Sequence, residues 1–213
     1  MKPSIFVLFP LAALLGFFNH ADAQIVGGFE ADIDFRVIEP PHRTSSPEGQ
    51  VEVAEVFMYS CLPCYRFEST LDEWLVGKPD HVNFVRIPGL WGEAAVVHAR
   101  AFFAAQALDK LEETHIAFFR EFHERGNQLD TIDKLSEFYA RFGIERSTFE
   151  TAFDNADDHV RRARELIGAY GVNGTPSIVV AGKFSTNPGM AAGSAATWFS
   201  IIEALAAAES GAE

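Results

Sequence analysis

The stretch EVFMYSCLPCYRFE, residues 55–68, contains both cysteines of a chain of 213 residues. The two thiols, Cys61 and Cys64, are separated by Leu62 and Pro63. A disulfide between them closes so small a ring that it removes little entropy from the unfolded chain, so a stabilising role explains the pair poorly. A structural zinc site needs four ligands, and the seven histidines are scattered along the sequence. We therefore expect redox chemistry at this pair, with no metal and no cofactor.

The residues on either side of the pair predict a strand and a helix. Residues 51–59, VEVAEVFMY, have apolar side chains at odd and even positions alike, which is typical of a strand buried on both faces. After Cys61 the apolar residues recur with a helical period, and the helix is expected to end near residues 77–79. Its buried face is expected to carry Cys64, Phe67, Leu71, Trp74 and Leu75. A C-x-x-C pair between a buried strand and a helix is the context in which this spacing indicates thiol chemistry.

The rest of the sequence predicts the other elements of an α/β domain. Residues 82–87, VNFVRI, are typical of a second buried strand, and residues 177–181 of a third, joined by a tight turn to a fourth. A final helix is expected over residues 195–208. Residues 24–50 are rich in Gly, Pro and Ser and predict an extended lead-in, with room for one short strand at residues 35–38.

A long helical segment separates the two halves of this domain. Residues 92–170 show helical periodicity throughout. Ser147 and Glu150 have the spacing of a capping box, which predicts the start of one helix with a long apolar stripe. His115 and His123 are expected on the helix surface, because they form no close pair with metal-ligand spacing.

The order of these elements predicts an α/β protein with a thioredoxin fold. A strand, a helix and a strand are followed, after the helical block, by a β-hairpin and a helix. We expect an all-helical domain inserted after the β-α-β unit and packed over one end of the sheet. On this division the thioredoxin-like domain comprises residues 51–91 and 171–213, the helical insertion residues 92–170, and the N-terminal lead-in residues 24–50.

The first residues have the pattern of a secretory signal peptide. A lysine precedes an apolar run over residues 5–18, and Ala21 and Ala23 form a small-x-small site. The run is broken by Pro10 and is shorter than the roughly 20 apolar residues of a spanning helix. We expect residues 1–23 to be removed by cleavage after Ala23, which leaves an exported chain without a membrane span.

The charge of the chain bears on its partners. The formal net charge is -13 and the isoelectric point is about 4.9. Contact with a phosphate backbone needs a basic face, so we expect no nucleic-acid partner.

The helix after Cys61 predicts different roles for the two thiols. Its N-terminus presents unpaired N–H groups and the positive end of the helix dipole, which stabilise a thiolate at Cys61. Cys64 lies one turn further and is expected to point toward the buried face. We therefore expect Cys61 to be the exposed sulfur that attacks or is attacked, and Cys64 to be the buried partner that closes or reopens the ring. Pro63 fits the first turn, where its missing N–H costs nothing.

Two further residues are candidates for the site. Glu55 lies in an otherwise apolar strand, so burial would raise its pKa and let it pass protons to and from Cys64. The alternative is that Glu55 lies at a sheet edge in water. Pro176 precedes a predicted strand, and an X-Pro bond adopts the cis form at modest cost. A cis bond there would leave the Thr175 backbone free to pair with an extended peptide, but the sequence does not determine the isomer.

These residues together resemble the DsbA family of periplasmic thiol-disulfide oxidoreductases. The resemblance is carried by residues 55–68 and by GVNGTP at residues 171–176, and it extends over nearly the whole chain. Either motif alone would indicate only the thioredoxin superfamily. The roles that the resemblance implies are nucleophile for Cys61, buried cysteine for Cys64, cis-proline for Pro176, substrate contact for Thr175 and buried acid for Glu55.

The resemblance also implies a reaction and its partners. The family donates its disulfide to unfolded or reduced exported proteins in the periplasm, and a DsbB-type membrane quinone reductase reoxidises it. One alternative is a thiol reductase or isomerase that a membrane partner holds reduced, and another is a redox-inactive peptide-binding chaperone. Isomerases of this superfamily usually carry a separate dimerisation domain, and no such segment is visible here, so the isomerase is a weaker alternative than the reductase. We expect a monomer.

The sequence departs from the family between the cysteines. The best-known members carry Pro and then His there, and the His helps to stabilise the thiolate. Leu62 offers neither a charge nor a hydrogen bond, so we expect Cys61 to be less acidic and the protein to be a weaker oxidant. Proline beside the second cysteine, as in Pro63, is the placement seen in reducing thioredoxins. The best-known members carry Val where this chain has Thr175, and this difference also favours a weaker oxidant. We also expect Leu62 and Pro63 to contact substrate.

Overall fold

The centre of the structure is a five-stranded mixed sheet with the strand order β3-β7-β6-β4-β5. The structure is a computed structural model that describes residues 24–211, so the predicted signal peptide lies outside the described residues. The strands of the sheet are β3 (Arg36–Val37), β4 (Val51–Phe57), β5 (Val82–Pro88), β6 (Ser177–Val180) and β7 (Phe184–Thr186). A separate two-stranded sheet of β1 (Ile25–Val26) and β2 (Phe29–Glu30) precedes it.

The pairing of β4 confirms the predicted β-α-β unit and hairpin. β4 pairs in parallel with β5 and antiparallel with β6, which in turn pairs antiparallel with β7. A parallel pair needs a crossover connection, and helix α1 (Leu62–Gly77) provides it. Every residue of β4 is buried, as the apolar residues at odd and even positions predict.

Helices α1 and α7 (Ala195–Ser210) cover one face of the sheet. Phe67 and Leu71 of α1 pack with Trp198 of α7 and with Val53 of β4 in one apolar cluster. Trp74, predicted on the same buried face of α1, is only partly buried and packs at the edge of this cluster. The removal of these side chains from water holds α1, and with it the cysteine pair, against the sheet.

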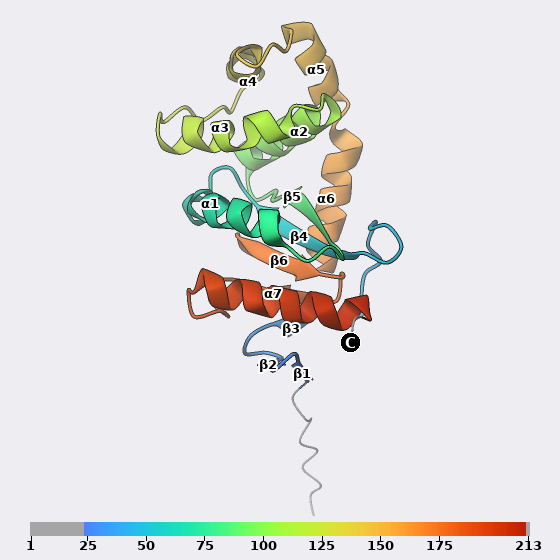
Figure 1. The fold of residues 1–213 in the computed structure, drawn as a ribbon. Helices are drawn as coiled ribbons and strands as arrows, with labels where there is room; N and C mark the ends of the chain where they lie inside the picture. The colour runs from blue at the N-terminus through green and yellow to red at the C-terminus, as the bar shows by residue number, and fades with distance from the viewer. Residues whose placement is uncertain (1–23, 212–213) are drawn as a thin grey trace, which may run out of the picture.

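The segment between β5 and β6 is helical, as predicted. Its helices are α2 (Glu93–Ala107), α3 (Leu111–His123), α4 (Ile132–Ala140), α5 (Arg146–Asp154) and α6 (Asp157–Ala169). Figure 1 shows α2 to α5 stacked above one end of the sheet. Within residues 24–211, no helix combines the length and the apolar character that crossing a bilayer requires.

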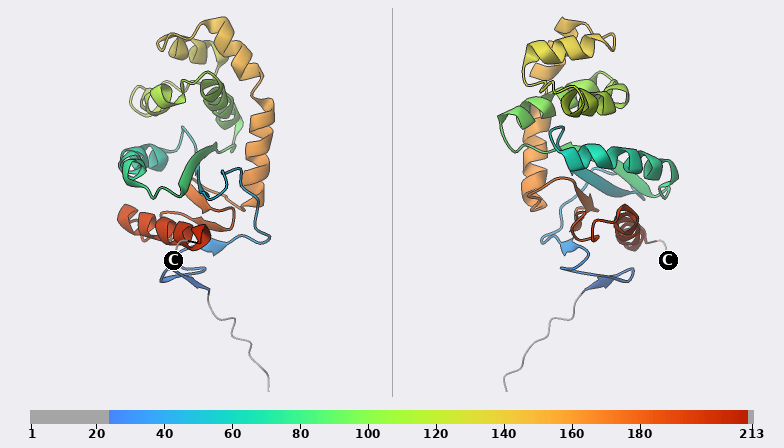
Figure 2. Two further views of the ribbon diagram at one scale, coloured as in Figure 1. Left: turned by 45° about the vertical axis from the view of Figure 1, so that its right-hand side comes forward. Right: turned by 90° about the vertical axis from the view of Figure 1, so that its left-hand side faces the viewer.

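Helix α6 differs from the rest of the block because it covers the second face of the sheet. Both views in Figure 2 show it running from below α5 down alongside the strands. An apolar cluster fills the space between this helix and the sheet. Its members are Ala163, Ile167 and Tyr170 from α6 and the residue after it, and Ala54, Val56 and Val179 from the sheet. One helix therefore joins the block to the sheet, and the domain boundary at residue 170 stays a prediction.

Two details of the block differ from the sequence prediction. The capping box at Ser147 and Glu150 is wrong, because α5 begins at Arg146 with Glu145 as its N-cap. Glu150 instead accepts a hydrogen bond from Arg146 Nε at 2.6 Å, one turn away on the same helix. The predicted apolar stripe is present, but a turn between α5 and α6 divides it between two helices.

The turn between β6 and β7 is held against the N-terminal lead-in. His42 N–H donates a hydrogen bond to the Gly182 carbonyl at 2.9 Å. Gly182 has a φ of 64°, and a Cβ at this position would overlap the His42 carbonyl oxygen. Only glycine therefore allows the lead-in to lie this close to the turn.

The substitution Gly182→Ala is expected to lower the free energy of unfolding by about 2 kcal/mol more than Gly143→Ala does. Gly143 also has a positive φ, 77°, but open space surrounds the position of its missing Cβ. The control therefore carries only the conformational cost of a left-handed alanine, about 1 kcal/mol. Chemical denaturation of both variants measures the difference, and equal losses would show that the lead-in does not press on the turn.

Candidate active site

The two cysteines form a disulfide at the N-terminus of α1. Cys61 is the N-cap residue, and its Sγ accepts a hydrogen bond from Cys64 N–H at 3.1 Å. Pro63 lies in the first turn, as predicted. Cys64 is completely buried, whereas Cys61 is 9% exposed, so the more accessible cysteine is the predicted one. Cys61 is nevertheless more enclosed than the sequence suggests, because other segments cover it.

The end of α1 favours negative charge on the Cys61 sulfur. The first turn of the helix carries no acidic side chain that would oppose a thiolate. Its unpaired N–H groups and the helix dipole stabilise an anion at this position. Because a stabilised thiolate favours the reduced pair over the disulfide, this placement makes the pair more oxidising.

One segment that covers Cys61 is the loop before β6. The Thr175–Pro176 peptide bond is cis, the isomer that the sequence left open. The Thr175 carbonyl oxygen lies 3.5 Å from Cys61 Sγ. In the described part of the chain, neither the N–H nor the C=O of Thr175 has a backbone hydrogen-bond partner. The loop therefore brings an unpaired stretch of backbone beside the disulfide.

Two hollows meet at Pro63 and Pro176, beside the disulfide. The first, of about 300 Å³, is lined by Pro63, Arg66, Phe67, Thr70, Pro176, Pro188, Gly193, Ser194, Ala195 and Trp198. The second, of about 410 Å³, is lined by Pro63, residues 173–177, Asn187 and Pro188. We call the two together the proline groove. Leu62 is 41% exposed but lines neither hollow.

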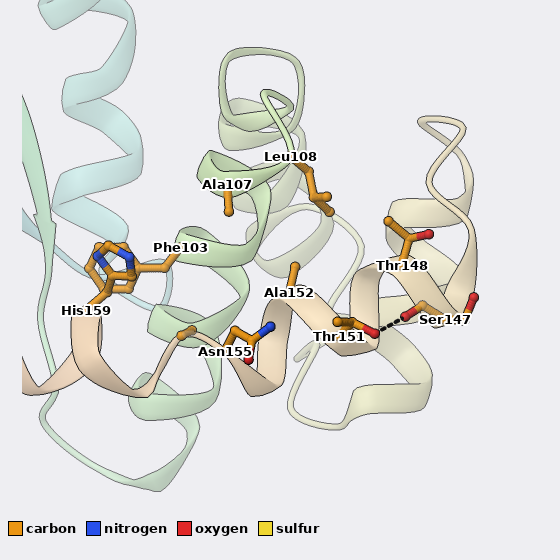
Figure 3. A pocket seen from close by; sticks show the side chains of 10 residues that line it. Phe103, Ala107, Leu108, Ser147, Thr148, Thr151, Ala152, Asn155 and His159 are labelled. Atoms are coloured by element: carbon orange, nitrogen blue, oxygen red, sulfur yellow. Dashed lines mark hydrogen bonds between the residues drawn. The ribbon is translucent and has the colours of Figure 1, made fainter.

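A further hollow, of about 580 Å³, lies away from the cysteines in the helical block. Figure 3 shows its lining, which includes Phe103 on α2 and Ser147 and Thr151 on α5. No predicted site residue lines it. Among the described residues, no three His, Cys, Asp or Glu side chains gather as the ligands of a metal ion would.

Glu55 is completely buried in β4, between β5 and β6, so the alternative of a sheet edge in water is wrong. Burial and the negative charge of Glu68 raise the pKa of Glu55 to about 8, although the cation of Arg86 opposes them. The predicted raised pKa is confirmed. The buried carboxyl has a cationic partner, because Arg86 Nε lies 3.3 Å from Glu55 Oε2.

Arg86 is shared between Glu55 and a second buried acid, Glu68. Arg86 is the register partner of Glu55 on β5, and its guanidinium lies 3.1 Å from Glu68 Oε2 on α1. Burial alone would raise the pKa of Glu68, but a hydrogen bond from His115 and the charge of Arg86 outweigh it, so the pKa is lowered. At neutral pH Glu68 is therefore the anion, and Glu55 holds a proton.

His115 belongs to this buried group, so its predicted position on the helix surface is wrong. It is 5% exposed, and burial lowers the pKa of its imidazole. As a neutral ring it donates from Nε2 to Glu68 at 3.3 Å and accepts the Tyr59 hydroxyl at Nδ1 at 2.9 Å. His123 is partly buried, with its ring stacked on Tyr65 and its Nε2 2.8 Å from the Tyr59 carbonyl.

Sequence reasoning missed Arg86, Glu68 and His115 as parts of the site. A signal for His115 was present, because it shares an apolar helical stripe with Phe118. Arg86 and Glu68 also occupy positions in a predicted buried strand and on a helix that follows the cysteines. A charge in such a position predicts a buried partner, which the sequence alone does not identify.

Known proteins are similar to this chain both in sequence and in fold. Residues 85–198 match the family model described as a DSBA-like thioredoxin domain. The thiol:disulfide interchange protein DsbA of Burkholderia cepacia is 32% identical over 157 residues, which cover 73% of this chain and 74% of the relative. This chain belongs to the DsbA family. The DsbA of Azotobacter vinelandii is 33% identical over 156 residues, which cover 72% of this chain and 73% of that relative.

Solved structures of DsbA proteins have the same fold. The crystal structure of Pseudomonas aeruginosa DsbA matches with a TM-score of 0.80 and 30% identity, over 85% of this chain and 94% of that one. Xylella fastidiosa DsbA matches with a TM-score of 0.76 and 29% identity, over 84% of this chain and 96% of that one. The predicted thioredoxin fold with inserted helices is thus confirmed. The protein is a thiol-disulfide oxidoreductase of the DsbA family.

Proposed function

We propose that this DsbA-family protein donates its Cys61–Cys64 disulfide to reduced proteins that have been exported to the periplasm. The observation that carries the proposal is the disulfide at the start of α1, with the Thr175 carbonyl 3.5 Å from Cys61 Sγ. Unpaired backbone beside a reacting sulfur suits an extended peptide that carries a cysteine.

The reaction transfers two electrons from the substrate to the enzyme. A substrate thiolate attacks Cys61 Sγ, the Cys61–Cys64 bond breaks, and Cys64 leaves as a thiolate that takes up a proton. The second substrate thiol then loses its proton and attacks the substrate sulfur of the mixed disulfide. Cys61 leaves as a thiolate, which the N-terminus of α1 stabilises. The substrate gains a disulfide, and the enzyme is left as a dithiol.

We assign Glu55 the role of proton donor to Cys64. Cys64 is completely buried, so water has little access to the thiolate that forms there. With a pKa of about 8, Glu55 is protonated at neutral pH and lies in the same buried layer beneath α1. A neutral acid with a pKa near the working pH is suited to giving and taking a proton.

We assign substrate contacts to the proline groove and its surroundings. The N–H and C=O of Thr175 can pair with the backbone of an extended substrate, and Pro176 holds the loop beside the disulfide. Pro63 lines both hollows of the groove and would meet apolar substrate side chains. Leu62, exposed beside Cys61, would contact the substrate outside the groove.

The location and the partners are inferred from the sequence and from the family. The pattern of residues 1–23 supports export with cleavage after Ala23. A DsbB-type membrane quinone reductase would then reoxidise the dithiol. We also propose that residues 92–170 form an inserted helical domain and that the protein acts as a monomer.

The reduction potential of the Cys61–Cys64 pair tests this proposal. Equilibration with reduced and oxidised glutathione is expected to give a value clearly above the roughly -270 mV of thioredoxin. Oxidation of a reduced peptide with two cysteines is expected in the same buffer. A potential near that of thioredoxin would overturn disulfide donation and favour the reductase alternative, which the Leu62-Pro63 dipeptide supports.

The double substitution Leu62→Pro with Pro63→His is expected to make the pair more oxidising. A histidine next to Cys64 adds a donor and a partial positive charge near the Cys61 thiolate, so it stabilises the reduced form. We expect the equilibrium constant with glutathione to change at least tenfold, which is about 30 mV. Leu62→Pro alone is the matched control, because it adds no donor. Equal potentials for the two variants would contradict the electrostatic explanation.

A further inference from the structure

Two buried acids, Glu55 and Glu68, share the cation of Arg86. Arg86 Nε lies 3.3 Å from Glu55 Oε2, and Arg86 Nη2 lies 3.1 Å from Glu68 Oε2. Both carboxyl groups are buried, so ionisation of both would leave one negative charge without a cation, away from water. One of the two acids therefore holds a proton at neutral pH, and the proposed donor role requires that it be Glu55.

Hydrogen bonds distinguish the two acids. Glu68 Oε2 accepts a hydrogen bond from Arg86 Nη2 at 3.1 Å, and Glu68 Oε1 lies 3.3 Å from His115 Nε2. Within residues 24–211, neither carboxyl oxygen of Glu55 has a hydrogen bond of ordinary geometry. Donated hydrogen bonds favour the charged form of a carboxyl group. The negative charge therefore belongs on Glu68, provided that His115 is a donor.

The Tyr59 hydroxyl determines which nitrogen of His115 carries the hydrogen. Tyr59 is 1% exposed, and burial raises the pKa of its phenol well above the usual value, so the hydroxyl keeps its hydrogen. In the described part of the chain its one hydrogen-bond partner is His115 Nδ1, at 2.9 Å. If Glu68 donated its proton to Nε2, the ring hydrogen would move to Nδ1 and the buried hydroxyl would lose its acceptor, which is costly. Tyr59 therefore holds His115 as a donor toward Glu68.

The other titratable groups around this cluster are bonded elsewhere or lie in water. Asp72 on α1 and Glu112 on α3 are exposed, and Asp72 Oδ1 is 4.0 Å from Arg86 Nη2. The buried groups His98 on α2 and Tyr139 on α4 are each bonded to a backbone carbonyl outside the cluster. Among residues 24–211, none of these four side chains is hydrogen-bonded to either buried acid.

We propose that His115 is a positioning residue, which keeps the negative charge on Glu68 and so reserves the transferable proton for Glu55. Tyr59 fixes the histidine in the tautomer that can do this. The inference rests on the proposed function, because it takes Glu55 as the proton donor to Cys64. In this role His115 acts through the two acids and exchanges no proton with the substrate.

Carbon magnetic resonance of the glutamate carboxyl groups tests this inference. The oxidised protein, carbon-labelled at those groups, is titrated from about pH 4 to about pH 10, and Glu55→Gln and Glu68→Gln assign the two signals. In the parent protein, Glu55 is expected to titrate near pH 8, and Glu68 is expected to titrate at a much lower pH. In His115→Phe, we expect the midpoint of Glu55 to fall, and that of Glu68 to rise, by about one pH unit or more.

Three further variants are matched to His115→Phe. His115→Gln is expected to restore most of the parent titration, because its amide N–H can donate to Glu68 while its carbonyl accepts the Tyr59 hydroxyl. Tyr59→Phe frees the tautomer of the histidine, so we expect shifts in the same direction as in His115→Phe but smaller. His98→Phe is the control, because it removes a buried histidine that is bonded to the Gln128 carbonyl instead of an acid. It is expected to leave both midpoints unchanged.

The pH profile of the reaction is the second readout. At about pH 7, His115→Phe is expected to oxidise a reduced two-cysteine peptide about two- to tenfold more slowly than the parent protein, because Glu55 is then largely ionised. Toward about pH 5 the two rates are expected to converge, because Glu55 is protonated in both proteins. A purely structural role of the histidine would instead lower the rate by the same factor at every pH.

The outcomes separate this inference from the proposed function. Unchanged midpoints of both acids in His115→Phe would overturn the inference, even if the protein oxidises peptides normally. Shifted midpoints with the same loss of rate at every pH would also overturn it, because the histidine would then not act through the Glu55 proton. If His115→Phe fails to fold, the titration of Tyr59→Phe decides in the same way. If the reduction potential excludes disulfide donation, the titrations of the oxidised protein still determine which acid holds the proton.

Discussion

Replacement of Cys61 by serine is expected to reduce disulfide transfer to the uncatalysed background. Serine offers no sulfur that a substrate thiolate can attack, so no mixed disulfide forms and no electrons pass to the enzyme. The measurement is the rate at which a reduced peptide with two cysteines is oxidised, with disulfide formation in exported proteins as the cellular readout. Unchanged activity in the cell would exclude the redox functions and favour the peptide-binding chaperone.

Cys64→Ser is the matched variant for this prediction, because it removes the other sulfur of the same ring. Reduced Cys64→Ser keeps the Cys61 thiol at the helix N-terminus but cannot form the internal disulfide. Mixed with a disulfide-containing substrate, it is expected to accumulate as a covalent complex through Cys61, which mass spectrometry detects. Cys61→Ser is expected to give no such complex, since Cys64 is completely buried. Trapping through Cys64 instead would reverse the roles of the two cysteines.

Glu55→Gln is expected to stabilise the fold at high pH and to have little effect at low pH. The folded state binds the Glu55 proton more tightly than the unfolded chain, with a pKa of about 8 against an ordinary 4.5. The contribution of Glu55 to the free energy of unfolding therefore falls as the pH rises from about 4.5 to about 8, and it levels off above that range. Glutamine removes this loss, because it cannot ionise.

The expected gain for Glu55→Gln at pH 9 is on the order of 3 kcal/mol, which corresponds to about 6 to 12 °C in Tm for a chain of this size. Thermal denaturation of the oxidised protein at pH 4.5 and pH 9 measures it. Glu52→Gln is the control on the same strand. Glu52 Oε2 accepts a hydrogen bond from Ser45 N–H at 3.2 Å, and glutamine weakens that contact, so no gain in stability is expected for this variant. A gain for Glu55→Gln that is equal at both pH values would show that its ionisation is not the cause.

The sequence was sufficient for the features that depend on local patterns. Apolar residues at odd and even positions predicted the doubly buried β4, and the change to a helical period after Cys61 predicted α1 with its end near Gly77. The position of the cysteine pair at a helix N-terminus followed from these two elements. Each of these patterns lies within one short segment, and the packing of β4 and α1 buries the apolar residues that the patterns indicate.

The features that the sequence did not predict depend on contacts between distant segments. His115 is 56 residues from Tyr59 and 47 from Glu68, and only the packing of α3 on α1 brings the three together. The pairing of Glu55 with Arg86 depends on the register of β4 and β5, which a hydrophobic pattern does not determine. The capping box failed for a local reason, since α5 begins before Ser147.

The hydrogen bond from the Cys64 amide to Cys61 Sγ joins a backbone group of the first helical turn to the reacting sulfur. The amide hydrogen at residue 64 senses the electron density of the reacting sulfur directly, because no other group lies between them. In nitrogen-labelled protein, the resonance frequency of this amide is therefore expected to report whether that sulfur is bonded, protonated or anionic. Disulfide turnover in this protein can be followed in real time from one backbone signal, without any chromophore on the substrate.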